Sequence, residues 1–199
     1  MKKITATELK NILAQHALWL ESGYHQGEQA ILIGENLRGA NLEGANLYLA
    51  NLYLANLYIA NLKGTNLSGA NLIGANLEDA HLEGANFSGA NLVDASLQGA
   101  YLQGANLLGA NLKCADLYDA NLERANLERA NLKGANLERA NLERANLKGA
   151  NLEGTILEKK EKTVRKDCAS VAPSFGEELQ KLLDKHGVKL AGPLAILPK

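Results

Sequence analysis

Apolar and polar residues recur along residues 30–159 with a period of five. Every fifth residue from Leu32 to Leu157 is apolar, and 25 of these 26 positions are leucine while the other is Phe87. The position two residues earlier is alanine in 23 of the 26 units, and the position between them is asparagine in 20. The other two positions vary freely. This is an internal repeat, which has to be explained before any other feature.

A period of five fits neither a continuous helix nor a continuous strand. At about 100° per residue, five residues carry a leucine about 140° past a full turn, so the leucines would form no stripe. In a strand, an odd repeat places each new leucine on the opposite face. Within one unit, however, alanine and leucine are two residues apart and lie on the same side of a short extended segment. A bend after each unit directs all of them to one axis, as in a solenoid.

The energetics predict that these coils must stack. Burying one leucine contributes about 1.5–3 kcal/mol, whereas ordering the backbone of five residues costs roughly 5–10 kcal/mol.

We expect the asparagine to help by bonding nearby backbone groups at the bend. The corner residue is glycine in 14 of 26 units, but Leu49, Asp79 and Arg124 also occupy it. We therefore expect that the corner does not require a positive φ in every unit.

The units ANLRGANLEGANL and ANLERANLKG resemble those of the pentapeptide-repeat proteins, whose usual unit is A(D/N)LXX. The resemblance covers residues 30–159, or 26 consecutive units. It implies an all-β solenoid: a right-handed quadrilateral parallel β-helix of four units per coil and about 6.5 coils, with leucine and alanine inside. Short α-helical segments are expected at the N- and C-terminal ends.

Residues 1–29 are predicted to form an N-terminal helical cap. A helix is expected over residues 5–21, because Thr5 and Glu8 have the spacing of a capping box and Ser22-Gly23 provides a stop. The segment HALWLESGYHQGEQAIL is similar to the segment that precedes the repeats in some bacterial and phage members of the family.

Residues 160–199 are predicted to form a charged linker, a short C-terminal helix and a tail. Ser174 and Glu177 suggest a second capping box, and Gly187 a stop. The helix would carry three leucines on one face: Leu179, Leu182 and Leu183. This segment either caps the last coil or associates with a second copy. The resemblance favours a homodimer through the C-terminal end, because some family members dimerise there.

Four units per coil place residues twenty apart above one another, so outward positions form vertical ladders. One ladder, called here the apolar stripe, begins with four apolar residues that should face solvent: Ile33, Tyr53, Ile73 and Val93. The tyrosine band directs six residues outward on three successive faces: Tyr48, Leu49, Tyr53, Leu54, Tyr58 and Ile59. Exposed apolar patches often mark interfaces. The alternatives are that the band packs beneath the N-terminal segment or reflects drift on a tolerant surface.

Charge and the absence of targeting features in the sequence exclude some classes of function. Residues 30–159 carry ten basic and fourteen acidic residues, and residues 160–199 carry eight and five. The sequence has no clustered basic stripe, which is the feature that would indicate nucleic-acid binding. The sequence shows no signal peptide and no apolar run of the roughly 18 residues that span a membrane, so we expect a cytoplasmic protein.

The sequence offers no candidate catalytic, cofactor or metal site. The four histidines lack metal-binding spacing; they are His16, His25, His81 and His186. Cys114 has no neighbouring base that would activate it, and no glycine-rich phosphate motif is present. We therefore expect that the chain is not an enzyme.

Three functions remain open on these grounds. The first is a non-catalytic structural or protein-binding module with an unknown protein partner. The second comes from the resemblance: certain pentapeptide-repeat proteins mimic DNA, bind DNA gyrase and confer quinolone resistance. Such mimicry requires a continuous acidic surface, whereas the repeats carry a net charge of only −4, interrupted by arginines. The third is a spacer that displays the cationic tail.

Overall fold

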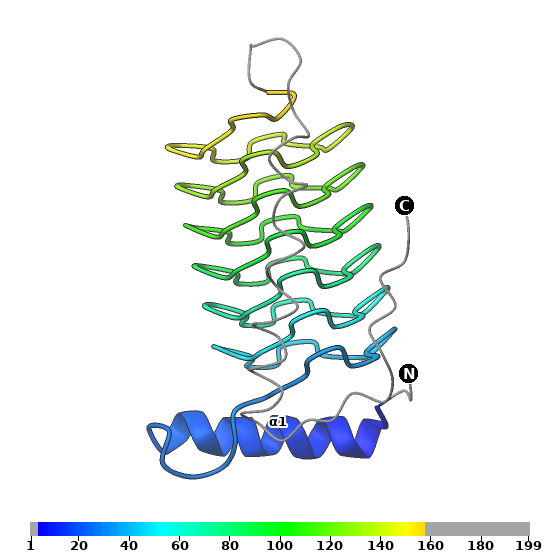
Figure 1. The fold of residues 1–199 in the computed structure, drawn as a ribbon, viewed down its shortest axis with the longest axis vertical. Helices are drawn as coiled ribbons and strands as arrows, with labels where there is room; N and C mark the ends of the chain where they lie inside the picture. Colours follow the sequence, from blue (N-terminus) through cyan, green and yellow to red (C-terminus); the bar gives the residue numbers. More distant parts are fainter. Residues whose placement is uncertain (1–3, 158–199) are drawn as a thin grey trace, which may run out of the picture. The chain divides into compact units, whose positions relative to one another are not determined.

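The computed structural model describes residues 4–157, which form one helix followed by stacked coils (Figure 1). The helix, α1 (Ala6–Glu21), begins and ends close to the predicted limits. Its capping box is formed as expected: the Glu8 N–H donates to Thr5 Oγ1 at 3.2 Å, and the Thr5 N–H donates to Glu8 Oε2 at 2.7 Å. The predicted C-terminal helix, with Leu179, Leu182 and Leu183, lies outside the described residues.

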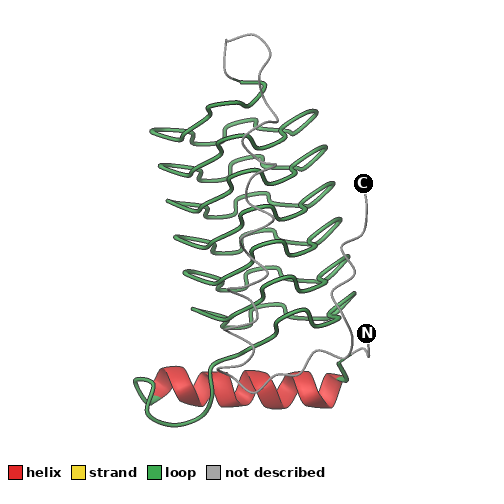
Figure 2. Cartoon of the chain, in the orientation of Figure 1, coloured by secondary structure: helices red, strands yellow, loops and turns green. Residues whose placement is uncertain are grey.

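The coils contain four units each, as the family resemblance implies. Parallel bridges join residues that are twenty apart, as in the pairs Asn51↔Asn71, Asn71↔Asn91 and Asn91↔Asn111. Within residues 4–157 the pairing consists of single-residue bridges, so Figure 2 draws the coils without strand arrows. At about 4.8 Å between paired segments, six coils rise by about 29 Å.

Each corner is a tight turn, and here one sequence-based expectation is wrong. The alanine N–H donates to the leucine carbonyl three residues earlier, as from Ala75 to Leu72 at 3.0 Å. The corner residue between them has a positive φ in every described unit, including Leu49 at 59°, Asp79 at 54° and Arg124 at 59°. These are features of a type II turn, whose third residue needs a positive φ. The turn geometry thus imposes this conformation even where it costs a non-glycine residue about 1–2 kcal/mol.

Asparagine completes the backbone hydrogen bonding, as expected. In the unit 71–75, the Asn71 N–H donates to the coil before, and the N–H groups of Leu72 and Gly74 donate to the coil after. The Ala75 N–H closes the turn, and the Ile73 N–H donates to the side-chain Oδ1 of Asn71 at 3.3 Å. All five amide donors of the unit are therefore satisfied, which a buried backbone requires.

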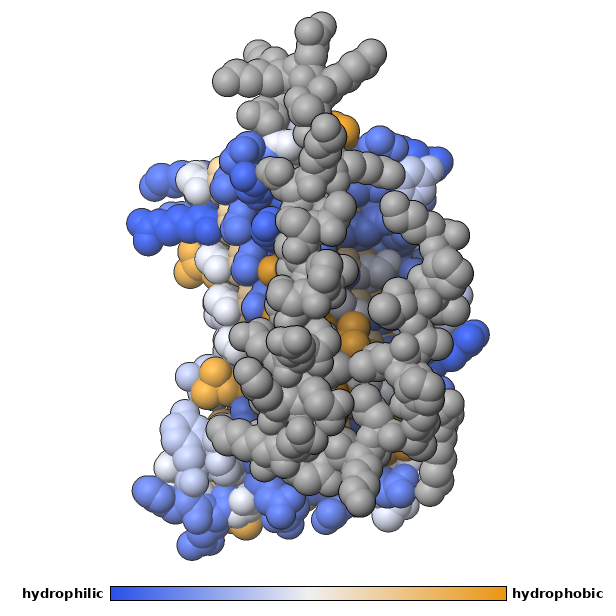
Figure 3. Space-filling model, viewed as in Figure 1, coloured by the Kyte–Doolittle hydropathy of each residue, from blue (hydrophilic) through white to orange (hydrophobic). Residues whose placement is uncertain are grey.

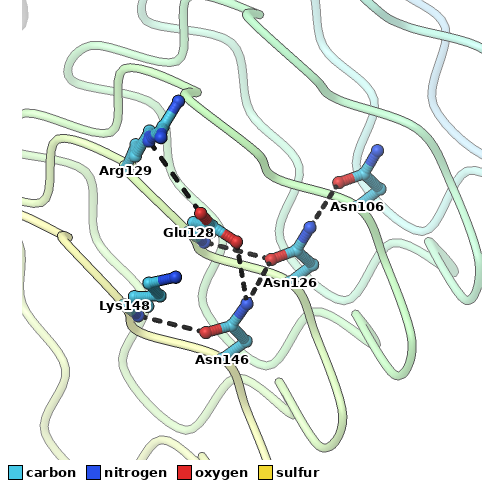
Figure 4. A network of polar contacts seen from close by, with 6 residues as sticks. All are labelled: Asn106, Asn126, Glu128, Arg129, Asn146 and Lys148. Carbon is cyan, nitrogen blue, oxygen red and sulfur yellow. Dashed lines mark hydrogen bonds and ion pairs between the residues drawn. The ribbon is translucent and has the colours of Figure 1, made fainter.

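The asparagine side chains also bond to one another along the column. Asn126 Nδ2 donates to Asn106 Oδ1 at 3.2 Å, and Asn146 Nδ2 donates to Asn126 Oδ1 at 3.1 Å (Figure 4). Charged residues join this ladder: Asn146 Nδ2 also contacts Glu128 Oε2 at 3.4 Å, and Arg129 pairs with Glu128 at 3.9 Å. One residue type thus serves both the bend and the stacking.

Leucine and alanine fill the interior, and the two ends of the column differ. Most of the leucines from Leu32 to Leu137 are completely buried. At the N-terminal end α1 contributes Leu9 to the same core. In the last described coil, by contrast, Leu142, Leu147 and Leu152 are only partly buried.

The difference between central and terminal coils gives a stability prediction. Replacing Leu92, which is fully buried, with alanine should lower the free energy of unfolding by about 2–5 kcal/mol because a cavity remains inside the stack. The matched change Leu152→Ala, in the last coil, should cost less than half as much. Urea unfolding followed by circular dichroism measures both. Equal losses would show that burial along the column does not control stability.

Candidate interaction surface

The apolar stripe is more deeply buried than the sequence suggested. Ile33, Tyr53 and Ile73 are half-buried, and Val93 is only 8% exposed. The expectation that Val93 faces solvent is therefore wrong. Stacking at about 4.8 Å allows ladder neighbours to cover one another, but this applies to every face of the column. Burial raises the pKa of the Tyr53 phenol.

The tyrosine band contains both half-buried and exposed members. Leu54 is 40% and Ile59 is 42% exposed, whereas the remaining four residues are half-buried: Tyr48, Leu49, Tyr53 and Tyr58. Gln29 of the N-terminal segment reaches the Leu49 carbonyl at 2.6 Å. The next two corners are not covered in this way, so packing beneath the N-terminal segment does not account for Leu54 and Ile59.

The three apolar corners of the band share a strained backbone. Leu49, Leu54 and Ile59 have φ values of 59°, 54° and 53°. A positive φ is unusual for any non-glycine residue, and for a β-branched residue such as Ile59 it is an outlier. The Leu54 side chain lies over Gly74, where a Cβ would come within 2.6 Å of Leu54 Cδ2. A glycine in the neighbouring coil thus makes room for this large corner residue.

Aromatic contacts lie both within the band and outside it. The Arg38 guanidinium lies over the Tyr58 ring, 4.7 Å from its centroid. Tyr101 stacks on His81 at 5.0 Å and is 42% exposed. Neither this pair nor the exposed Leu108 was among the residues predicted from the sequence, although the twenty-residue spacing of His81 and Tyr101 predicts their stacking. In Figure 3, apolar residues form separate orange patches, and blue residues are dense over the C-terminal coils.

The junction between α1 and the first coil is built around His16, a role that the sequence did not reveal. His16 is completely buried, and its Nδ1 accepts a hydrogen bond from the Ala30 N–H at 3.1 Å. Trp19 stacks on its ring at 5.5 Å. Burial lowers the pKa of His16, and the Tyr48 backbone opposes this to a smaller extent. Gly27 has a φ of 72°, and a Cβ there would lie 2.7 Å from the backbone nitrogen of Trp19. The close approach of these two backbone segments therefore requires glycine.

The described residues offer little for chemistry. Residues 4–157 contain no group of three His, Cys, Asp or Glu side chains placed to hold a metal ion. A cleft of about 470 Å³ lies between α1 and the first coil, where Leu9, Leu13 and Leu37 line it, and Lys10 is the one titratable residue in its described wall. None of the helices described is both long enough and apolar enough to cross a membrane.

Comparison with known proteins decides the family. The sequence profile described as pentapeptide repeats matches eight copies over five overlapping ranges: residues 28–58, 50–89, 60–97, 90–129 and 120–158. The chain belongs to the pentapeptide-repeat family. No curated protein matches this pentapeptide-repeat chain in sequence.

Several solved structures resemble this pentapeptide-repeat chain. HetL of the cyanobacterium Nostoc sp. PCC 7120, involved in heterocyst differentiation regulation, is 35% identical over 68% of this chain and 69% of HetL, with a TM-score of 0.26. Rfr23 of the cyanobacterium Cyanothece 51142 is 31% identical over 75% and 96% of the two chains, with a TM-score of 0.31. QnrB1, a plasmid-mediated fluoroquinolone resistance protein, is 19% identical over 81% and 97%, with a TM-score of 0.38.

The buried His16 predicts that acid weakens the N-terminal junction of this pentapeptide-repeat protein. Because its pKa is lower in the folded state, the unfolded chain binds the proton more tightly. Its contribution to stability is complete above the unfolded pKa of about 6.5 and is lost as the pH falls toward the folded pKa. Between neutral and mildly acidic pH, the melting temperature of H16Q should therefore fall less than that of the wild type.

The exposed residue His25 provides the matched control. The variant H25Q should retain the pH dependence of the wild type in the same thermal melts. If H16Q and the wild type have the same pH dependence, His16 does not control the junction.

Proposed function

We propose that this chain is a non-catalytic protein-binding module whose partner binds at the exposed corners of the tyrosine band, centred on Leu54 and Ile59. The observation that carries the proposal is that their large apolar side chains are exposed at corners with a positive φ, whereas the other exposed non-glycine corners of the described residues hold aspartate or arginine. Glycine would occupy these corners without strain. Strained residues that persist at a surface are a reason to suspect function.

The surroundings of these corners suit a protein interface. Tyr48, Tyr53 and Tyr58 flank them and are half-buried, so little conformational freedom remains for a partner to restrict. Arg38 adds a guanidinium held over Tyr58. Aromatic residues and arginine are enriched in interfaces and dominate their binding energy.

Replacing both apolar corners with glycine separates binding from folding. In L54G/I59G the relief of about 1–2 kcal/mol of backbone strain per corner offsets most of the lost packing and the added chain entropy, so stability should change little. Removing the side chains at the centre of an interface costs at least about 2 kcal/mol of binding free energy, which is about 30-fold in affinity. The measurement is quantitative mass spectrometry of proteins captured from the native host by the tagged full-length chain, with thermal melts in parallel.

The control variant R129G/R144G removes the side chains of two other corner residues that also have a positive φ, 58° and 59°. It should retain every partner that the wild type captures. Retention of the same partners by L54G/I59G would contradict the proposed surface. Unfolding of that variant would show that the two residues serve the fold.

Charge pairing argues against gyrase binding by DNA mimicry. Arginines neutralise acidic residues in the C-terminal coils: Arg124 lies 3.4 Å from Glu123, Arg139 lies 3.4 Å from Asp119, and Arg144 lies 3.6 Å from Glu143. A duplex mimic needs an unbroken negative potential, which these pairs interrupt.

We therefore expect no protection of DNA gyrase. A supercoiling assay with a quinolone should give the same inhibition curve with and without a stoichiometric excess of the full chain. A rightward shift of that curve would revive the mimicry hypothesis. The same shift with R124E/R139E alone would identify the arginines as the barrier.

A further inference from the structure

The first coil has an open hydrogen-bonding edge on two faces of the column. In the second coil, the Asn56 N–H donates to the Glu35 carbonyl at 2.9 Å, and the Asn56 carbonyl accepts from the Leu37 N–H at 2.8 Å. Asn36 and Asn41 hold the same position in the first coil, which has no coil before it. Within residues 4–157, neither the backbone N–H groups nor the carbonyls of these two asparagines have a hydrogen-bond partner.

Both asparagines line the cleft between α1 and the first coil (Figure 1), which has a volume of about 470 Å³. This volume lies within the range of ligand-binding sites. Leu9 and Leu13 of α1 give the cleft an apolar wall. On the side of the coil, Ala40 is only partly buried, whereas Ala60 at the same position of the second coil is completely buried. The cleft therefore combines backbone groups without partners and apolar side chains without full cover.

The arrangement of these backbone groups indicates what the cleft binds. Each asparagine offers one N–H and one carbonyl, and the two asparagines are five residues apart, on either side of the corner Gly39. Elsewhere in the column the backbone of a parallel neighbouring coil matches this arrangement. An extended peptide carries the same alternation of donors and acceptors and can add to an open edge in the same way. Its inward residues would be small and apolar in turn, like the alanine and leucine of a repeat unit.

Charges beside the edge define a register for such a peptide. Arg38 and Glu43 hold the outward position of the two units that line the cleft. At the same position on the face of Glu43, Lys63 pairs with Glu83 of the following coil at 3.0 Å. Opposite charges on facing segments are favourable, and like charges are unfavourable. A peptide parallel to the first coil should therefore carry an acidic residue beside Arg38 and, five residues later, a basic residue beside Glu43.

We propose that the cleft binds an extended peptide segment of a partner protein, which runs parallel to residues 36–41 and pairs its backbone with Asn36 and Asn41. The segment has two units with a small residue followed two positions later by an apolar residue, and its acidic outward residue precedes its basic one. Peptide binding in the cleft goes beyond the function proposed for the tyrosine band and does not depend on it.

Amide hydrogen exchange in the full-length chain tests the backbone pairing. The probe is the synthetic peptide ANLEGANLKG with both ends blocked, and nuclear magnetic resonance measures the exchange. With the peptide at about 1 mM, exchange at Asn36 and Asn41 should slow at least about ten-fold, because binding protects both amides. Asn46 is the internal control: its N–H also lacks a partner within residues 4–157, but it does not line the cleft. Its exchange should not change.

A second peptide of identical composition tests the register. ANLKGANLEG places a basic residue beside Arg38 and an acidic residue beside Glu43, so it should bind at least about three-fold more weakly. Equal protection by the two peptides would overturn the proposed register. Absence of protection at Asn36 and Asn41, or equal protection of Asn46, would overturn the site.

The variant A6W tests the position of the peptide in the cleft. Ala6 is exposed and lines the cleft, whereas the adjacent Thr7 is exposed and does not line it. The indole of A6W should block the cleft and remove the protection of Asn36 and Asn41, whereas T7W should retain it. Protection that persists in A6W would overturn the site. If thermal melts show that A6W disrupts α1, the comparison of the two peptides on the wild type still decides.

Discussion

Hydrogen bonding between successive coils is the constraint on which the rest of this structure depends. In a central unit such as 71–75, three of the five amide donors find their acceptors in other coils. A single coil would leave these donors unpaired, and a buried unpaired amide is costly. Stability is therefore a property of neighbouring coils, as in other solenoids. The asparagine side chain supplies the fourth acceptor, which explains why this residue recurs although its side chain lies outside the core.

The same constraint explains the tolerance of the corners. From Gly34 to Gly134, each corner donates its own N–H to the next coil, as Leu54 does to Ile73 at 2.9 Å and Arg124 does to Glu143 at 2.9 Å. Bonds on both sides of the turn hold the positive φ in place whatever the side chain. A corner can therefore hold leucine, aspartate or arginine at a cost of about 1–2 kcal/mol each. The outward positions can vary without changing the path of the backbone.

The core could be predicted from the sequence because leucine and alanine report burial directly, and the completely buried Phe87 falls in the same register. The corner conformation could not, because it depends on a turn that closes through backbone atoms, and residue types such as Arg124 give no sign of it. The burial of Val93 and the hydrogen bond from Ala30 to His16 were equally hidden. Both depend on which segments meet in space, whereas the five-residue pattern records only the radial direction of each side chain.

The two ends of the column show how the repeat is limited. At the N-terminal end, α1 buries Leu9 against the core and His16 accepts the Ala30 N–H, so a non-repeating element satisfies part of the first coil. At the other end of the described residues, Leu142 and Leu152 are only partly buried. Burial of the core leucines is therefore complete beside α1 and incomplete in the last described coil.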